Sequence, residues 1–237
     1  MKLYYDFHIH TCLSPCGDND MTPNNIVNMA SLKGLDAIAI TDHNCAFNAS
    51  ACIEAAKDLP LTVIPGMEIE TSEEVHMVAL FEDINNLYKM QDMVLDCLPK
   101  IKNKPEIFGE QIIMDSQDDV KGFYDAFLIT ACSMSVYEAT KEVRNLNGVI
   151  FPAHIDKSSY SIVSNLGTVP KDLDFKTVEI KGNPTPCKFV EEGYESEFFV
   201  IHNSDAHYLW DISEKKNYIE CKSNDISEIL NKISLGR

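Results

Sequence analysis

Residues 3–10 read LYYDFHIH, an aromatic and aliphatic run that ends in two histidines. Such a run, close to the start of the chain, is typical of a buried strand. His8 and His10 are two positions apart, so on a strand both imidazoles lie on one face and can bind one metal ion. Taken alone, the pair fits two hydrogen-bonded structural histidines equally well, and only the rest of the chain can separate the two interpretations.

Beyond residue 10, short β-rich runs alternate with helical patterns, which is typical of βα units in a parallel sheet or barrel. Thr22 with Pro23 marks a helix start and Gly34 its end, and Ser135 marks another helix start. We predict strands over 3–10, 36–43, 61–70, 75–81, 148–154, 177–182 and 197–207. We predict the other helices over 47–58, 84–102, 135–147 and 225–235, a loop over 156–172, and no firm assignment for 103–130.

The chain is strongly acidic, with 20 Lys and Arg against 37 Asp and Glu, a net charge of −17, and arginine only at Arg144 and Arg237. A surface this negative repels a phosphate backbone at long range, so we expect no extended nucleic acid as a partner. No apolar stretch at the N-terminus resembles a signal peptide, and no window reaches the roughly 18 apolar residues of a membrane span. We therefore expect a cytoplasmic protein with no membrane partner and eight reduced cysteines. The oligomeric state is not indicated.

The placement of the histidines is the most informative feature of the sequence. Six of the seven lie at or just beyond a predicted strand: His8, His10, His43, His76, His154 and His207. Glu68 and Asp205 accompany them. In a βα barrel the carboxyl ends of the strands converge, so these side chains are expected to meet. Histidine and carboxylate ligands together suit zinc, manganese or iron, and so many ligands indicate more than one ion.

Six motifs occur in a fixed order along the chain: FHIHT, ITDHN, PGMEIE, VHMVAL, PAHID and NSDAH. This order resembles the polymerase and histidinol phosphatase (PHP) family of metal-dependent phosphoesterases. The resemblance implies an α/β fold, a distorted (β/α)7 barrel similar to a TIM barrel, with the metal site at the C-terminal ends of the strands. It also implies that residues 1–237 form a single PHP domain that holds two to three divalent ions (Zn, Mn or Fe).

The resemblance further implies which residues hold each ion. One ion would be held by His8, His10, Glu68 and Asp205, and a second by Glu68, His76 and His154. A third would use His43, His207 and an acidic residue soon after His10. At that last position the stretch TCLSPCGDNDMTP departs from the usual family pattern, and counting back from the helix start at Thr22 places Asp18 there. Cys16 is the second alternative for this ligand and Asp20 the third.

Other residues are candidates for catalysis and substrate binding. We expect Asp42 to orient a ligand histidine or to assist proton transfer, and His207 to assist proton transfer as well. Lys157 lies where many members of the family have a phosphate-binding arginine, and Lys181 and Arg144 are further candidates for binding substrate. The segment 82–146 is longer than a βα step needs, so we interpret it either as a lid that selects the substrate or as barrel helices with a hairpin.

The ligand set and the resemblance together predict a function. We expect hydrolysis of a small phosphorylated metabolite or nucleotide by a hydroxide activated at a di- or trinuclear metal site. One alternative is a metal-dependent hydrolase of an amide-type bond, because metal-binding barrels serve both chemistries. Another is a metal-binding regulatory module without catalysis.

Overall fold

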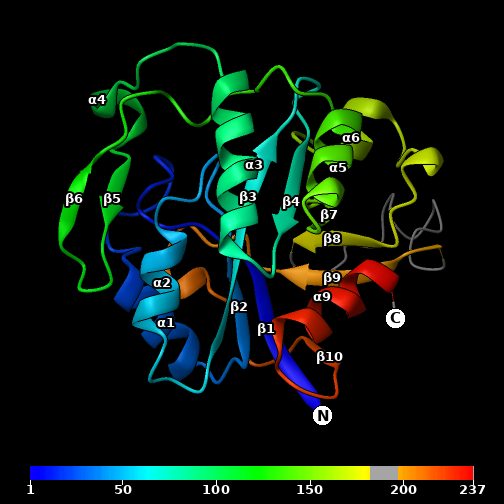
Figure 1. Ribbon diagram of the computed structural model, residues 1–237, viewed down its shortest axis with the longest axis horizontal. Coiled ribbons are helices and arrows are strands. Elements are labelled where there is room, and N and C mark those ends of the chain that lie inside the picture. Colours follow the sequence, from blue (N-terminus) through cyan, green and yellow to red (C-terminus); the bar gives the residue numbers. More distant parts are fainter. Residues whose placement is uncertain (182–196, 237) are drawn as a thin grey trace.

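The computed structural model describes residues 1–181 and 197–236 of the chain. A curled six-stranded sheet lies at its centre (Figure 1). The strand order is β10 (Tyr218–Glu220), β1 (Lys2–Ile9), β2 (Ala37–Ile40), β3 (Thr62–Glu70), β4 (His76–Leu80) and β7 (Val149–Pro152). Strands β1, β2 and β3 are parallel, whereas β4 runs antiparallel to both β3 and β7, and β10 runs antiparallel to β1.

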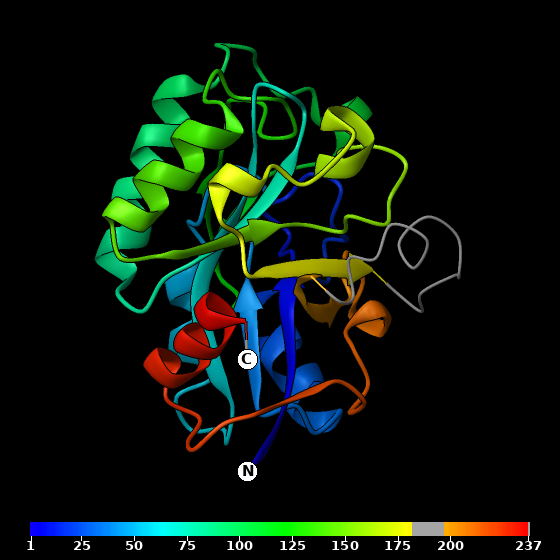
Figure 2. The ribbon, with the colours of Figure 1, turned by 90° about the vertical axis from the view of Figure 1, so that its right-hand side faces the viewer.

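A second pair of parallel strands, β8 (Thr177–Lys181) and β9 (Phe199–Asn203), closes the barrel between β7 and β1. The backbone N–H of Ile155, just after β7, donates to the carbonyl of Glu179 at 2.8 Å, and a parallel bridge joins Ile9 to Ala206. In the view of Figure 2 the β8 ribbon crosses the ends of β1 and β2. The predicted α/β fold with a distorted barrel is therefore confirmed.

Strand β3 changes neighbours at Gly66, and this change corrects the expectation of uniformly parallel strands. Its first half pairs with β2 and its second half with β4. A Cβ atom on Gly66 would lie 2.7 Å from Leu80 Cδ2 and 2.9 Å from the Ala79 carbonyl, so only glycine permits this close approach. Because β4 is antiparallel, its first residue, His76, lies opposite Glu70 at the end of β3. The start of β4 and the end of β7 thus share one edge of the sheet.

The alternation of side chains along β1 separates the core from the metal-site face. Leu3, Tyr5 and Phe7 are buried in one apolar cluster with residues of the neighbouring strands, such as Ile64 and Phe151. The even-numbered positions point to the opposite face because successive side chains alternate in a strand. His8 and His10 occupy that face, and both are fully buried.

Helices cover the outside of the sheet and begin where the sequence indicates. They are α1 (Pro23–Leu32), α2 (Ala49–Ala55), α3 (Ile84–Cys97), α5 (Val136–Asn145) and α9 (Ile226–Leu235). Thr22 Oγ1 accepts a hydrogen bond from the Asn25 N–H, and Ser135 forms a capping box with Glu138, so both predicted helix starts are confirmed. Helix α3 ends earlier than predicted because Leu98, which precedes Pro99, adopts an extended conformation.

Two segments differ from the sequence expectation or were left unassigned. The predicted loop 156–172 contains a short helix, α6 (Ile162–Leu166), and its last residues begin the 3-10 helix η1 (Lys171–Leu173). The unassigned segment 103–130 forms helix α4 (Pro105–Phe108) and a hairpin of β5 (Ile112–Met114) and β6 (Val120–Phe123). A further 3-10 helix, η2 (Leu209–Asp211), follows the last predicted site motif.

Among the described residues, no helix is long and apolar enough to cross a membrane.

The β5–β6 hairpin holds the loop that follows β1. The Ile112 N–H donates to the Cys12 carbonyl at 3.0 Å, and Asp118 Oδ2 accepts from Thr22 Oγ1 at 2.7 Å. Asn48 bridges the two segments, since its Nδ2 donates to Thr11 Oγ1 of the loop at 3.0 Å and to the Ile112 carbonyl of the hairpin at 2.9 Å, and its Oδ1 accepts from the Met114 N–H at 2.9 Å. The hairpin therefore fixes loop 11–22 against the barrel.

Candidate metal centre

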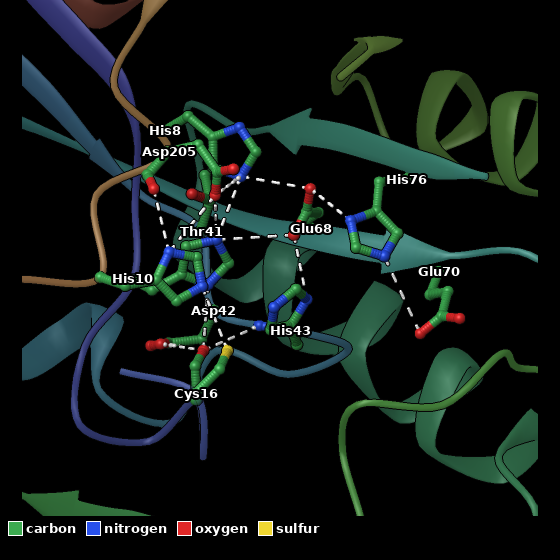
Figure 3. Close-up of polar contacts among 12 residues, drawn as sticks. His8, His10, Cys16, Thr41, Asp42, His43, Glu68, Glu70, His76 and Asp205 are labelled. Carbon is green, nitrogen blue, oxygen red and sulfur yellow. Dashed lines mark hydrogen bonds and ion pairs between the residues drawn. The ribbon is translucent and has the colours of Figure 1, made fainter. Parts of the chain in front are cut away.

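Six histidines and two carboxylates meet at one edge of the barrel (Figure 3). They come from the end of β1, the loops after β2, β7 and β9, the second half of β3 and the start of β4. The residues are His8, His10, His43, Glu68, His76, His154, Asp205 and His207, and all but His207 are buried. The sequence prediction that these eight side chains converge is therefore met by the geometry.

Glu68 lies at the centre of this cluster. Its Oε1 is 2.9 Å from His76 Nδ1, 3.2 Å from His8 Nε2 and 3.3 Å from His154 Nε2. Its Oε2 is 2.9 Å from His43 Nδ1 and 3.5 Å from His10 Nε2. One carboxylate thus faces five imidazoles, with each oxygen directed at a different group of them. This is the arrangement expected of a ligand shared between ions.

Asp205 lies on the other side of His8 and His10. Its Oδ1 is 3.3 Å from His10 Nε2, 3.6 Å from His8 Nε2 and 3.5 Å from His207 Nδ1. Asp205 and Glu68 therefore enclose the two β1 histidines between two carboxylates. The set that the resemblance implies for the first ion is assembled in space.

The electrostatics of the cluster keep both carboxylates ionised. Burial alone would raise the pKa of Glu68, but His76, His8 and His43 together hold that pKa well below its usual range. Burial opposes ionisation of Asp205 in the same way, and His8 and His10 hold its pKa well below the usual range. For His10, burial and the nearby His207 and His43 lower the pKa well below the ordinary histidine value. A neutral imidazole is the form that binds a metal ion.

The residues fit a group of divalent ions. Donor atoms lie within 4.8 Å of one another in three overlapping sets, His8 with His10 and Glu68, His43 with Glu68 and His76, and His10 with His43 and His207. Within the described part of the chain, four buried side-chain nitrogens and oxygens of the cluster have no hydrogen-bond partner: His43 Nδ1, Glu68 Oε2, His76 Nε2 and His154 Nδ1. Unpaired buried polar atoms are costly, and bound cations would satisfy those that face the cluster.

Glu179 supports the cluster from β8 and was missed by the sequence reasoning. Its carboxylate oxygens lie 2.9 and 3.0 Å from His8 Nδ1, and it also accepts from the His154 N–H at 2.9 Å and from Asn203 Nδ2 at 2.7 Å. It is fully buried. Such a carboxylate fixes the tautomer of His8 and turns Nε2 toward the centre. The signal in the sequence was a lone carboxylate inside the apolar strand TVEIK.

Replacing Glu179 by glutamine is expected to weaken metal binding about 10- to 100-fold, because the amide holds the His8 imidazole less firmly. Calorimetric titration of zinc into the metal-free variant measures this change. Glu54→Gln is the matched control, since Glu54 is exposed and pairs only with Lys57 on the surface. Unchanged zinc affinity in the Glu179 variant would show that this residue does not position His8.

Asp42 holds the loop after β1 rather than facing the centre. Its Oδ1 accepts from the Thr11 N–H and from Ser14 Oγ, both at 2.7 Å, and its Oδ2 accepts from Thr11 Oγ1 at 2.8 Å. Ser14 Oγ in turn lies 3.1 Å from His10 Nδ1. The geometry favours the role of orienting a ligand histidine, through Ser14, while a role of Asp42 in proton transfer stays a prediction.

The geometry favours Cys16 over Asp18 as the additional ligand beside His43 and His207. Cys16 Sγ lies 3.1 Å from His207 Nε2. The Asp18 carboxylate instead accepts the Asp20 N–H at 2.8 Å, and the exposed Asp20 takes part in that turn through its backbone. The loop bends back at Gly17, so the side chain of Cys16 reaches the His207 imidazole whereas Asp18 meets His207 only through its backbone N–H, and counting from Thr22 could not detect this bend.

Two of the three predicted substrate-binding cations reach the centre. Lys157 Nζ lies 2.7 Å and Lys181 Nζ 3.0 Å from Asp205 Oδ2. Arg144 does not reach it, which corrects that expectation. Its guanidinium donates to the Leu173 carbonyl at 2.7 Å. The side chain lines a hollow beside Val149, the first residue of β7, whereas His154 follows the last residue of that strand. Arg144 lies on the surface helix α5, and the sequence does not indicate in which direction its side chain points.

Two curated relatives are similar to part of this chain. An uncharacterised protein of Methanocaldococcus jannaschii is 36% identical over 88 residues, which cover 33% of this chain and 52% of that protein. The 5'-3' exoribonuclease Rnm of Salmonella typhimurium is 38% identical over 89 residues, 34% of this chain and 28% of that enzyme. The matched stretch thus spans about half of the first relative and less than a third of the second.

Solved structures share the fold over almost the whole chain. The lesion-specific endonuclease Q of Pyrococcus furiosus superposes with a TM-score of 0.71 at 18% identity, over 99% of this chain and 56% of that one. A candidate metal-dependent phosphoesterase of Bifidobacterium adolescentis gives a TM-score of 0.62 at 18% identity, over 98% of this chain and 95% of that one.

These similarities correct the expectation that excluded extended nucleic acid. Rnm is an exoribonuclease, and endonuclease Q has also been solved with a 27-mer duplex that carries an abasic lesion at its active site. The physical reason is that net charge describes the whole surface, whereas bound cations and nearby lysines reverse the sign of the field at a metal centre. The −17 charge therefore does not exclude a nucleic acid at this centre.

The sequence profile of the PHP domain matches residues 6–151. This range contains five of the eight clustered residues, His8, His10, His43, Glu68 and His76, and the remaining three follow it on the same barrel edge. The match covers more than half of the chain, and the chain belongs to the PHP domain family of metal-dependent phosphoesterases.

Proposed function

We propose that the protein hydrolyses phosphodiester bonds in single-stranded nucleic acid at a centre of two to three divalent ions. The observation that carries this proposal is the cluster around Glu68, in which one buried carboxylate faces five imidazoles and Asp205 closes the other side. The similarity to Rnm and to endonuclease Q supports nucleic acid as the substrate class.

The first ion would be held by His8, His10, Glu68 and Asp205, the second by Glu68, His76 and His154, and a third by His43 and His207 with one further ligand. Zinc, manganese and iron all accept these ligands. Such ions supply Lewis-acid stabilisation of phosphoryl oxygens and an activated water at neutral pH. The fit rests on the close donor sets and on the unpartnered buried donor atoms described above.

The chain's own residues would bind and orient the scissile phosphate. Lys157 and Lys181 each keep 38% of the side chain exposed while contacting Asp205, so both ammonium groups can also reach a phosphate at the mouth of the centre. Each acts as a point charge, without the two-pronged contact of an arginine. A role of His207 in proton transfer, from a side chain that is 21% exposed, stays a prediction.

An exposed aromatic pair follows the centre directly in sequence and supports a single-stranded substrate. Tyr208, the residue after His207, stacks on Trp210 with ring centroids 4.8 Å apart and planes 14° from parallel. Trp210 is 71% exposed and is the one tryptophan of the chain. Exposed aromatic faces beside a phosphate-binding centre stack unpaired bases with little regard to sequence. We propose that this pair receives a base of the bound strand.

Replacing Trp210 by alanine is expected to weaken binding of a single-stranded oligonucleotide about tenfold or more, because stacking on an aromatic ring is worth about 1–3 kcal/mol per base. Anisotropy of a labelled oligonucleotide measures this affinity, and quenching of the single tryptophan reports the same event in the wild type. Tyr218→Ala is the control, since Tyr218 is an exposed ring on β10, beside the N-terminal half of β1. Equal affinity in the Trp210 variant and the wild type would remove the aromatic pair from the substrate site.

We also propose that residues 1–237 act as one domain and that the segment 82–146 influences substrate choice. The β5–β6 hairpin of this segment fixes the loop that carries Cys16, so it can act on the centre without closing over it. Replacing exposed residues of the hairpin, such as Phe123, which is 56% exposed, tests its influence on substrate choice more cleanly than deleting the hairpin.

A substrate panel tests the proposed function. Single-stranded RNA and DNA oligonucleotides, duplexes, small phosphate monoesters and amide substrates are incubated with the metal-loaded protein. The proposal expects release of nucleotides from single strands. Hydrolysis of amides alone would favour the amide-hydrolase alternative, and metal binding with no hydrolysis of any substrate would favour a regulatory module. Cleavage confined to small monoesters would limit the function to metabolites.

A further inference from the structure

Cys16 lies among the imidazoles at the open end of the centre. Its Sγ is 3.1 Å from His207 Nε2. The His207 ring is 4.2 Å from the His10 ring, and the His10 ring is 4.4 Å from the His43 ring, measured between centroids. Nitrogens of these three histidines lie within 4.8 Å of one another. The thiol therefore borders a set of donors already close enough to share an ion.

The loop around Cys16 is built to hold the thiol at this place. The Gly17 N–H donates to the Ser14 carbonyl at 2.8 Å, and the Asp18 N–H donates to the His207 carbonyl at 2.9 Å. A Cβ on Gly17 would lie 2.7 Å from the Thr11 carbonyl, so the tight turn requires glycine there. Asp42 anchors the start of the same loop through Thr11 and Ser14. The backbone of the loop thus places residue 16 beside His207, where its Sγ reaches His207 Nε2.

His43 borders the same place from the loop after β2. It is only 4% exposed, and its Nδ1 faces Glu68 Oε2 at 2.9 Å. Its ring lies 4.4 Å from the His10 ring and 6.0 Å from the His207 ring, measured between centroids, and the Cys16 thiol interacts with the same imidazole. By contrast, other cysteines that the structure describes, such as Cys45 and Cys52, are fully buried in apolar clusters. Cys16 is thus an exposed thiol that faces nitrogen donors, whereas those cysteines pack as small apolar residues.

We propose that Cys16, together with His43 and His207, binds the third ion, and that this position is selective for zinc. Thiolate is a soft ligand that favours zinc, whereas the histidines and carboxylates of the other two positions also accept manganese. The inference rests on the proposed metal centre and not on its substrate. With Cys16 as a ligand, the centre would have one ion position with a sulfur ligand and two positions with only nitrogen and oxygen ligands.

Cobalt substitution tests the proposal through a signal that does not depend on activity. Cobalt bound to a thiolate shows a charge-transfer band in the near ultraviolet, so the cobalt-loaded wild type should show this band and Cys16→Ser should lack it. The half-buried Cys97 serves as the matched control, because Cys97→Ser leaves the centre untouched and should keep the band. Elemental analysis should find about one zinc ion fewer per chain in Cys16→Ser than in the wild type.

A carboxylate at the same position provides the second variant. Cys16→Asp should retain the third ion but shift the competition between zinc and manganese at least about tenfold toward manganese, because the soft ligand is replaced by a hard one. Absence of the thiolate band in the cobalt-loaded wild type, or an unchanged zinc content and preference in both variants, would overturn the role of Cys16. Binding of no ion at all would overturn the metal centre as well, whereas a thiolate band without nucleic-acid hydrolysis would overturn only the proposed function.

Discussion

Replacing Glu68 by glutamine is expected to lower hydrolysis by about a thousandfold or more, because charge stabilisation at the reacting group is the largest single contribution to such catalysis. Glu68 is the carboxylate that both of the first two ions would share, and it contacts five imidazoles. Its loss should also lower the metal content to one ion or none. Steady-state hydrolysis of a single-stranded oligonucleotide and elemental analysis measure the two effects.

Glu70→Gln is the matched control for this prediction. Glu70 is on the same strand and is also buried, but its Oε2 lies 3.9 Å from His76 Nε2, farther than any imidazole contact of Glu68. Burial raises the pKa of Glu70 to about 7, so its charge near neutral pH is only partial. We expect less than about a tenfold loss from this variant. Full metal content and near-normal activity in Glu68→Gln would contradict the assignment of Glu68 as the shared ligand.

Replacing Asp42 by alanine is expected to destabilise the protein by about 3 kcal/mol, because it removes two acceptors and leaves buried donors without partners. The donors are the Thr11 N–H, the Thr11 hydroxyl and the Ser14 hydroxyl. Burial raises the pKa of Asp42, and hydrogen bonds from Ser14 and Thr11 oppose that rise. Urea unfolding of the metal-free protein measures the loss of stability without a contribution from bound ions.

Two further variants distinguish a hydrogen-bonding role of Asp42 from a general effect of mutation. Asp42→Asn keeps one carbonyl oxygen for the Thr11 N–H and Ser14, so it should recover about half of the lost stability. Asp20→Ala changes an exposed residue of the same loop and should shift stability by less than about 0.5 kcal/mol. An Asp42→Ala protein as stable as the wild type would show that the loop does not depend on this carboxylate.

The local features of the fold were predictable from the sequence because local interactions determine them. The cap residues Thr22 and Ser135 occupy helix starts since their side chains satisfy free N–H groups there. The period of two along residues 3–10 correctly placed His8 and His10 on one face of the strand, where their Nε2 atoms lie 3.1 Å apart. The antiparallel direction of β4 was not predictable, because a strand has the same side-chain period in either direction.

The candidate site was predictable as far as strand ends determine positions. His8, Glu68 and His154 meet because each belongs to the same edge of a barrel. Glu179 was missed because its role depends on how β8 closes the barrel between β7 and β9, which brings its carboxylate to His8 and which no local pattern reveals. The sequence favoured Asp18 over Cys16 as a ligand of the third ion because the turn at Gly17, which brings Cys16 to the site, depends on a contact with the distant His207 carbonyl.

The net charge of the chain and the local field at the metal centre act over different distances. A net charge of −17 sets the long-range field, but in the proposed function a nucleic-acid strand would be held at short range by the ions and by Lys157 and Lys181. The affinity for a nucleic-acid strand should therefore fall only weakly as the salt concentration rises, because two lysines neutralise few phosphates.

The most direct test of the account is the metal content of the protein measured together with cleavage of a single-stranded oligonucleotide, before and after treatment with a chelator. The account predicts two to three ions per chain, release of nucleotides, loss of both after chelation, and recovery of both when zinc or manganese is restored. Cleavage that persists in protein freed of metal, or a protein that binds no divalent ion, would contradict the account.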